Sequence, residues 1–196
     1  MSSDKDSKII RFPGSVPPHG ILQLRVELLL MPLPVWRRFL VPEQYSFWDL
    51  HVAIQDTMGW QDKHLHQFTL DDPVTAERIR LGIPDDSGFY GDDEVLPCWE
   101  YRVTRFMKPG ALPALYTYDF GDEWQHEVLL EANLPGKRSM KLPHCLAGEG
   151  RCPDEDSGGP AACRDHLEPA FGDDFVPEEV IYENPRDRWD RVFRHD

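Results

Sequence analysis

The sequence predicts an α+β fold built on a mostly antiparallel sheet, which opens strand, strand, helix, strand. We expect the helix to pack on one sheet face and long loops rich in proline and glycine to connect the elements. Three stretches carry this prediction: alternating apolar residues at 21–31, a capped helical stripe at 46–59 and aromatic alternation at 116–132. An apolar period of two is typical of a half-buried strand, and a spacing of three to four is typical of a helix.

The first strand is predicted at residues 21–31, where leucine and valine alternate with Gln23, Arg25 and Glu27. A proline-rich turn at 32–34 follows, and residues 35–41 are predicted to form a second strand antiparallel to the first.

The helix is predicted to begin at Ser46, whose hydroxyl suits an N-cap, with Asp49 supporting the first turn. Gly59 is a suitable stop, because glycine adopts the left-handed conformation that ends many helices. His51 lies away from the apolar stripe of this helix, so we expect it on the surface.

Residues 63–70 are predicted to form the next strand, with His64 and His66 on one face. Two such imidazoles lie about 6.6 Å apart at the backbone, close enough to chelate one metal ion. The acidic stretch 71–97 is expected to be a solvated insertion. Residues 99–107 are expected to form a strand.

The densest pattern lies at residues 116–132, which we interpret as strand, tight turn at Gly121, and strand. His126 faces inward in this reading, either as a core residue or as a base or metal ligand. Asp119 and Asp122 are candidate catalytic carboxylates beside it. Asp122 and His126 would lie about 13 Å apart on one extended strand, so they meet only if the turn folds Asp122 back.

The segment 143–163 reads as a cysteine-containing loop in which Cys145 and Cys152, with His144 or Cys163, could bind zinc. Residues 171–196 are expected to be partly helical. A helix is expected to start at Pro177, and Pro185 is expected to interrupt the run.

Composition narrows the function classes. The net charge of −14 argues against broad nucleic-acid or anionic-membrane binding, because phosphate contacts need clustered lysine and arginine. Four cysteines and no apolar signal segment fit a reducing cytoplasm, and no apolar run is long enough to span a bilayer. We expect a loose leader at residues 1–20 and a single domain at 21–196.

Several motifs, in order, resemble the plasmid pRiA4b ORF-3-like family, whose members are described as mobile-element passenger proteins and labelled resolvase-like. The matching segments are residues 34–38, 50–60, 64–68, 118–126 and 145–159. The likeness covers roughly residues 20 to 190 and implies the same α+β opening. It implies no defined activity. Where the family loop reads Cys-Pro-Pro-Glu-Asp-Cys-Gly-Gly, this chain has Asp154 and Ser157 in place of the second proline and the last cysteine. A thiol-based metal site would therefore need Cys163.

Three function hypotheses remain open. The first is a binding or accessory module for a protein or small-molecule partner, with a recognition surface formed by Trp36, Arg37, Trp60 and Trp124. The second is a metal-dependent hydrolase that uses His64, His66 and His126, with Asp119 or Asp122 as ligand or base. The third is a structural zinc loop at Cys145 and Cys152 without catalysis.

Overall fold

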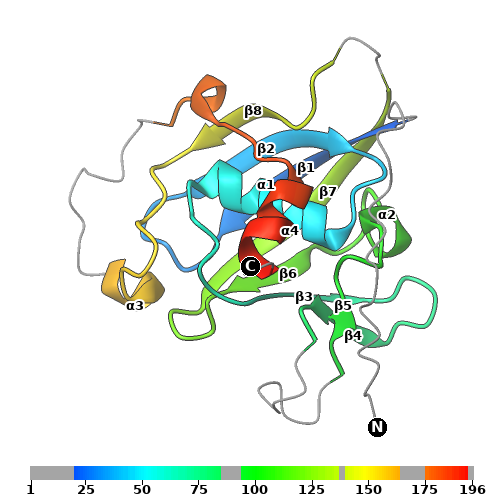
Figure 1. The fold of residues 1–196 in the computed structure, drawn as a ribbon, viewed down its shortest axis with the longest axis horizontal. Helices are drawn as coiled ribbons and strands as arrows, with labels where there is room; N and C mark the ends of the chain where they lie inside the picture. Colours follow the sequence, from blue (N-terminus) through cyan, green and yellow to red (C-terminus); the bar gives the residue numbers. More distant parts are fainter. Residues whose placement is uncertain (1–19, 85–93, 137–139, 164–174, 194–196) are drawn as a thin grey trace, which may run out of the picture.

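The computed structural model describes residues 20–84, 94–136, 140–163 and 175–193, which form one eight-stranded sheet with helices (Figure 1). The strand order is β5-β4-β3-β6-β7-β1-β2-β8. Neighbouring strands are antiparallel except β4 and β5, which are parallel. The α+β class and the mostly antiparallel sheet agree with the sequence prediction.

The strands are β1 (Gly20–Leu28), β2 (Val35–Pro42), β3 (His66–Asp71), β4 (Arg78–Gly82), β5 (Leu96–Pro97), β6 (Ala114–Tyr118), β7 (Trp124–Pro135) and β8 (His144–Glu149). The helices are α1 (Phe47–Met58), α2 (Val103–Phe106), α3 (Gly159–Cys163) and α4 (Pro185–Phe193), with a 3₁₀ turn, η2 (Pro177–Glu179).

Strand β1 lies between β2 and β7 near the middle of the sheet. Its alternation has the predicted outcome: Leu22, Leu24, Val26 and Leu28 are buried, while the polar residues between them are partly exposed. The pleat sends successive side chains to opposite faces, so one face meets the helices and the other meets solvent.

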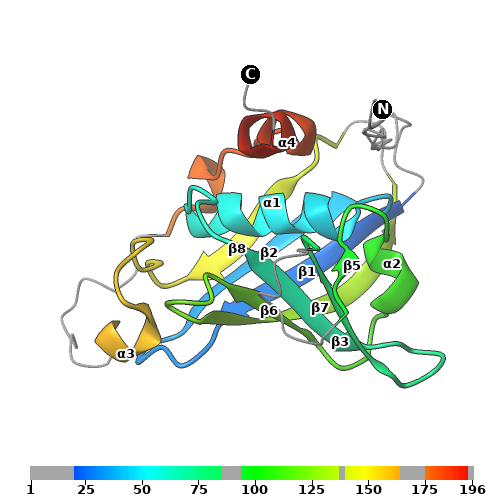
Figure 2. The same ribbon diagram turned by 60° about the horizontal axis from the view of Figure 1, so that its bottom comes forward.

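Helix α1 begins and ends as its capping residues predict. The Ser46 hydroxyl accepts from the Asp49 backbone N–H, the Asp49 carboxylate accepts from the Ser46 N–H, and Gly59 ends the helix at φ 79°. Figure 2 shows α1 lying across one face of the sheet with α4 outside it. Polar residues of α1 also face the sheet, where His51 and Gln55 both bond the Tyr116 hydroxyl of β6. The expectation that His51 lies on the surface is therefore wrong: its exposed fraction is 0%.

The hairpin predicted at residues 116–132 is confirmed as β6 and β7, joined by a turn at residues 119–123. Tyr116, Tyr118, Trp124 and His126 all face the interior and are fully buried. The aromatic density of this stretch therefore forms the core beneath α1 rather than an exposed surface.

Two strand predictions need correction. Residues 99–107 form a turn and the short helix α2, which brings the Tyr101 and Phe106 rings within 5.6 Å. A strand would hold these two residues about 17 Å apart. Strand β3 starts only at His66, so His64 precedes it, and the two imidazoles do not share a strand face.

Other segments are more ordered than the sequence suggests. The acidic stretch 71–97 supplies β4 and β5, although its residues 85–93 lie outside the described part of the chain. The cysteine-containing segment supplies β8 and α3. Pro185 starts α4 instead of interrupting a helix, since its fixed φ and missing N–H suit the first helical position. The predicted leader lies outside the described residues, apart from Gly20.

Candidate functional site

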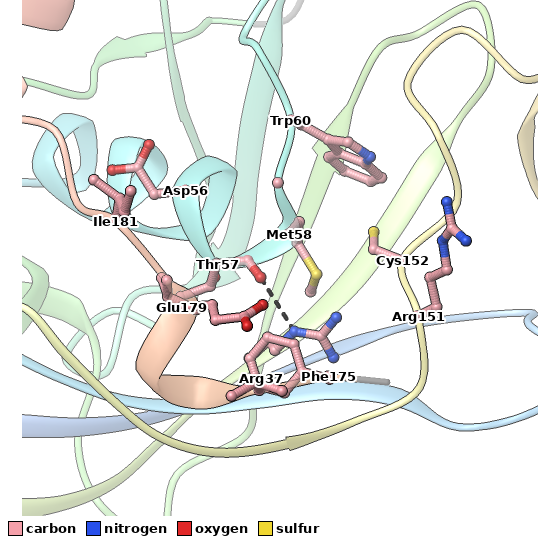
Figure 3. A pocket seen from close by; sticks show the side chains of 13 residues that line it. Arg37, Asp56, Thr57, Met58, Trp60, Arg151, Cys152, Phe175, Glu179 and Ile181 are labelled. Carbon is pink, nitrogen blue, oxygen red and sulfur yellow. Dashed lines mark hydrogen bonds between the residues drawn. The ribbon is translucent and has the colours of Figure 1, made fainter. Parts of the chain in front are cut away.

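A pocket of about 460 Å³ lies where β2, the end of α1, the loop after β8 and residues 175–181 meet (Figure 3). Arg37 forms its floor, Met58 and Trp60 one wall, and Phe175 another. We call it the Arg37 pocket. Its volume falls in the range of sites that enclose small molecules.

Arg37 is an unusual floor for a pocket, because its exposed fraction is only 2%. The guanidinium donates from Nε to the Thr57 carbonyl (3.1 Å) and from Nη1 to the carbonyls of Trp36 (2.9 Å) and Glu149 (2.8 Å). In the described part of the chain, no carboxylate lies within ion-pair distance of Arg37, and no acceptor faces Nη2. Burial lowers the pKa of Arg37. The positive charge of Arg37 is thus stabilised by hydrogen bonds to neutral backbone carbonyls.

The sequence orients Arg37 inward through strand register. Val35, Arg37 and Phe39 share the buried parity of β2, while Trp36 and Arg38 take the opposite face. Arg37 pairs with Gly148 of β8. A Cβ at Gly148 would lie 2.8 Å from the Arg37 Cδ and 2.5 Å from the Phe175 Cε1, so glycine makes room for both side chains. The Phe175 ring covers the guanidinium at 3.7 Å.

The rest of the lining is mixed in character. Trp60 is held by a hydrogen bond from its indole N–H to the Pro153 carbonyl (2.9 Å). Cys152 lies beside it, and burial raises the pKa of the Cys152 thiol to about 12, so the thiol is protonated at neutral pH. Two exposed charged residues complete the rim, Arg151 on the loop after β8 and Glu179 in η2 (Figure 3).

A second cluster joins His64, Asp119 and Asp156 at the surface, from three separate segments of the chain. The His64 Nε2 lies 2.5 Å from the Asp156 Oδ1 and 3.5 Å from the Asp119 Oδ2. One donor atom from each residue lies within 4.8 Å of the others, a spacing that a cation could bridge. Lys63 also reaches Asp156, at 3.1 Å, and neutralises part of the charge. His64 and Asp119 were predicted as candidates, whereas Asp156 was not.

Asp119 is oriented by its own turn. Its backbone adopts φ 54°, and its Oδ1 accepts from the backbone N–H groups of Gly121 (2.9 Å) and Asp122 (3.4 Å), which leaves Oδ2 toward His64. Asp122 turns away and accepts from the Gly158 N–H at 2.9 Å. The turn therefore separates the two candidate carboxylates and gives each a different partner.

His66 belongs to a buried network that the sequence did not predict. Its ring stacks on His51 at 3.5 Å, and burial together with His51 lowers the pKa of His66 well below its ordinary value. His51 bonds the Asp62 carboxylate (2.9 Å) and the Tyr116 hydroxyl (2.8 Å). Although burial alone would raise it, the pKa of Asp62 is held low by His51, His66 and Arg188. Trp48 packs on both imidazoles, and Trp189 packs on Trp48.

His126 stands apart from both clusters. It packs against Trp60 at 5.4 Å and Tyr116 at 5.3 Å, and in the described residues neither ring nitrogen has a well-formed hydrogen bond. Burial lowers the pKa of His126 to about 3, which the nearby backbone of Tyr116 and Trp124 only partly offsets. His64, His66 and His126 thus occupy three different environments, and the structure does not assemble them into one metal centre.

The remaining predicted residues are also dispersed. Trp36 lies on the far sheet face between the guanidiniums of Arg25 (5.0 Å) and Arg38 (5.3 Å), and Trp124 is a core residue with no exposure. The Cys145 thiol points toward the Arg38 and Ala147 carbonyls, at 3.7 and 3.8 Å. Among the described residues, the histidine, cysteine and carboxylate donors gather only at His64, Asp119 and Asp156, so Cys145 and Cys152 do not form a zinc-ligand set there.

Comparison with known proteins shows the family to which this chain is similar. Residues 20–190 match the family described as plasmid pRiA4b ORF-3-like protein, which is most of the chain. The chain belongs to the plasmid pRiA4b ORF-3-like family. The match covers the Arg37 pocket, the surface cluster and the buried histidine network together.

Two proteins similar to this chain have no described activity. The uncharacterized protein y4hQ of Sinorhizobium fredii is 32% identical over 141 residues, which are 72% of this chain and 68% of y4hQ. The crystal structure of a protein of unknown function, MM3350 from Methanosarcina mazei Go1, is 35% identical with a TM-score of 0.71 and covers 87% of this chain and 97% of its own. In the described residues, no helix is both long enough and apolar enough to cross a bilayer.

Proposed function

We propose that this protein is a binding module that holds a small molecule in the Arg37 pocket. The observation that carries the proposal is the meeting of Arg37 and Trp60, two of the four residues expected to recognise a partner, in one cavity of about 460 Å³. Pockets in this volume range that combine apolar side chains with a few polar groups are the usual form of small-molecule sites.

The architecture supports a preformed site. Arg37 is fixed by three hydrogen bonds and Trp60 by one, so neither side chain must be ordered when a ligand enters. Groups held in place before binding lose less conformational entropy on association, which favours affinity. The glycine at position 148 maintains the space in which Arg37 and Phe175 stack.

A fragment screen by ¹⁵N–¹H NMR tests the proposal. We expect binding fragments to shift the amides of residues 56–60, 148–152 and 175–181 together. The variant Val180→Trp adds an indole to the lining and should abolish these shifts, whereas Leu112→Trp, at a side chain that is 84% exposed and outside the pocket, should leave them unchanged. Hits that map elsewhere and persist in Val180→Trp would contradict the proposed function.

A second candidate function, metal-dependent chemistry, is favoured by the geometry of His64, Asp119 and Asp156 alone. One imidazole and two carboxylates suit zinc or manganese, and such an ion would activate a bound water for hydrolysis. Calorimetric titration with Zn²⁺ and Mn²⁺ tests it. Stoichiometric binding that is lost in His64→Ala but kept in His144→Ala, an exposed histidine on β8, would support the metal site. Equal affinity in both variants would exclude it.

A further inference from the structure

We infer that the ligand of the Arg37 pocket is a monoanionic organic acid, a carboxylate with an apolar body; this inference rests on the proposed function and specifies it. The first support is the unbalanced charge at the floor. Arg37 is buried, three of its N–H groups bind backbone carbonyls, and in the described residues no carboxylate neutralises it. An uncompensated buried cation is costly, and a carboxylate bound to it would remove that cost.

The second support is the location of the remaining donor. Nη1 and Nε of Arg37 are occupied, so Nη2 is the group left to bind a ligand in the pocket that Arg37 lines. Arg151 lies on the loop that forms another part of the same lining (Figure 3). In the described part of the chain, Arg151 has no ion-pair partner either. Two arginines from separate elements thus line one pocket in a protein whose net charge is −14, with the Arg151 side chain extending away from Arg37 (Figure 3).

The side chains that line the pocket indicate which uncharged group the ligand carries and how much negative charge it can have. Met58, Trp60, Phe175 and Ile181 offer apolar surface, which suits a hydrocarbon or an aromatic ring. Asp56 is also in the lining, but Arg188 neutralises it at 2.6 Å. Among the described residues Glu179 has no such ion-pair partner, and it adds a negative charge at the rim. A dianion such as a phosphate ester would meet stronger repulsion there than a monoanion does.

Isothermal titration of the full chain with four probes tests the inference: hydrocinnamate, the neutral hydrocinnamyl alcohol, hydrocinnamyl phosphate and inorganic phosphate. We expect hydrocinnamate to bind about tenfold or more tightly than the alcohol, since a charge-assisted hydrogen bond contributes that much. It should also bind more tightly than the phosphate ester, and inorganic phosphate should bind weakly or not at all.

Variants locate the contact. Arg37→Met should weaken hydrocinnamate binding by about tenfold. Because Arg37 also bonds three carbonyls, this variant can lose its fold, so two exposed positions provide the independent test. Arg151→Met should weaken binding several-fold and Glu179→Gln should strengthen it. The matched control is Arg25→Met, which removes an arginine from the opposite sheet face, where it pairs with Glu27.

The outcomes separate this inference from the proposed function. If the alcohol and the acid bind with equal affinity and Val180→Trp abolishes the binding of both, the pocket is a binding site but its ligand is not an anion. That result would overturn this inference and leave the proposed function standing. Tighter binding of the phosphate ester would likewise overturn the monoanion. Hydrocinnamate binding that is unchanged in Arg151→Met, Glu179→Gln and Val180→Trp would place the acid elsewhere and overturn both proposals.

Discussion

At the scale of single residues, some buried polar side chains have hydrogen-bond partners that offset their loss of water, and others do not. His51 bonds a carboxylate and a hydroxyl, whereas His126 is enclosed by aromatic rings and lacks a well-formed bond among the described residues. An imidazole in such a place is stable only when neutral, because burial disfavours the charged form. For this reason burial lowers the pKa of His126 to about 3, so the imidazole is neutral at neutral pH.

The first prediction concerns acid stability at His126. In the unfolded chain this imidazole titrates near its ordinary value, about 6.5. Since the folded pKa is lower, the unfolded state binds the proton first, and stability is lost as pH falls from about 6.5 toward about 3. The loss is about 1.4 kcal/mol per pH unit for one such group. Replacing His126 by leucine should remove it, making the difference in unfolding free energy between about pH 7 and pH 5 smaller by about 2 kcal/mol.

Urea denaturation at the two pH values measures this change. His66 contributes in the same direction in both proteins, so the comparison of wild type with His126→Leu isolates the one residue. An identical pH dependence in the two proteins would show that His126 is not the acid-sensitive group.

At the scale of elements, α4 is attached by one buried arginine as well as by its aromatic face. Arg188 is 4% exposed at its side chain and donates to Asp56 at 2.6 Å, and it also bonds Glu183. Trp189 packs edge-on against Trp48 at 5.0 Å, and the Trp48 indole donates to the Pro185 carbonyl at 3.0 Å. Helix α4 thereby covers the outer side of α1, and Arg188 reaches Asp62 of the histidine network at 3.5 Å.

The second prediction follows from that attachment. Arg188→Met leaves the buried carboxylate of Asp56 without its cation and removes one of the partners of Asp62, and we expect a loss of roughly 3 kcal/mol or more. Hydrogen exchange should show faster exchange of the α4 amides than of the β1 amides, because the loss is local. The control Arg191→Met removes an exposed partner of Glu183 and should cost less than about 1 kcal/mol. Equal effects of the two variants would mean that the buried pair does not anchor the helix.

At the scale of the whole molecule, α1 and α4 lie over one face of the sheet (Figure 2). The polar residues of β1 and β2 point to the other face. The uncovered face carries ion pairs between side chains, such as Arg38 with Glu131 at 2.6 Å and Arg25 with Glu27 at 2.6 Å. Among the described residues of this face, Arg25 and Arg38 are already paired with carboxylates, and the net charge is −14, so we expect little attraction of phosphate groups to it.

The third prediction tests the resolvase-like label of the family. We expect negligible binding to duplex DNA in fluorescence anisotropy at low ionic strength, where electrostatic attraction would be strongest. Strong binding that weakens steeply as salt rises would contradict this expectation. Arg25→Met together with Arg38→Met would then show whether the open sheet face carries that binding.

The sequence by itself determined the elements whose signals are local. The alternation of β1, the capping box of α1 at Ser46 and Asp49, and the turn between β6 and β7 were all predictable, because each depends on neighbours a few residues apart. For the same reason, His126 could be placed inside. The family could also be recognised, since its motifs are short and contiguous.

Only the tertiary structure decided which polar residues meet. His64 and Asp156 are 92 positions apart and Arg37 and Glu149 are 112 apart, and no local periodicity encodes such pairs. The prediction for His51 is wrong because its burial depends on His66 of β3 and Tyr116 of β6, which lie far from it in the chain. The Arg37 pocket has the same origin: strand register turns the arginine inward, and distant segments enclose it, because long-range packing brings together side chains that the order of the chain keeps apart.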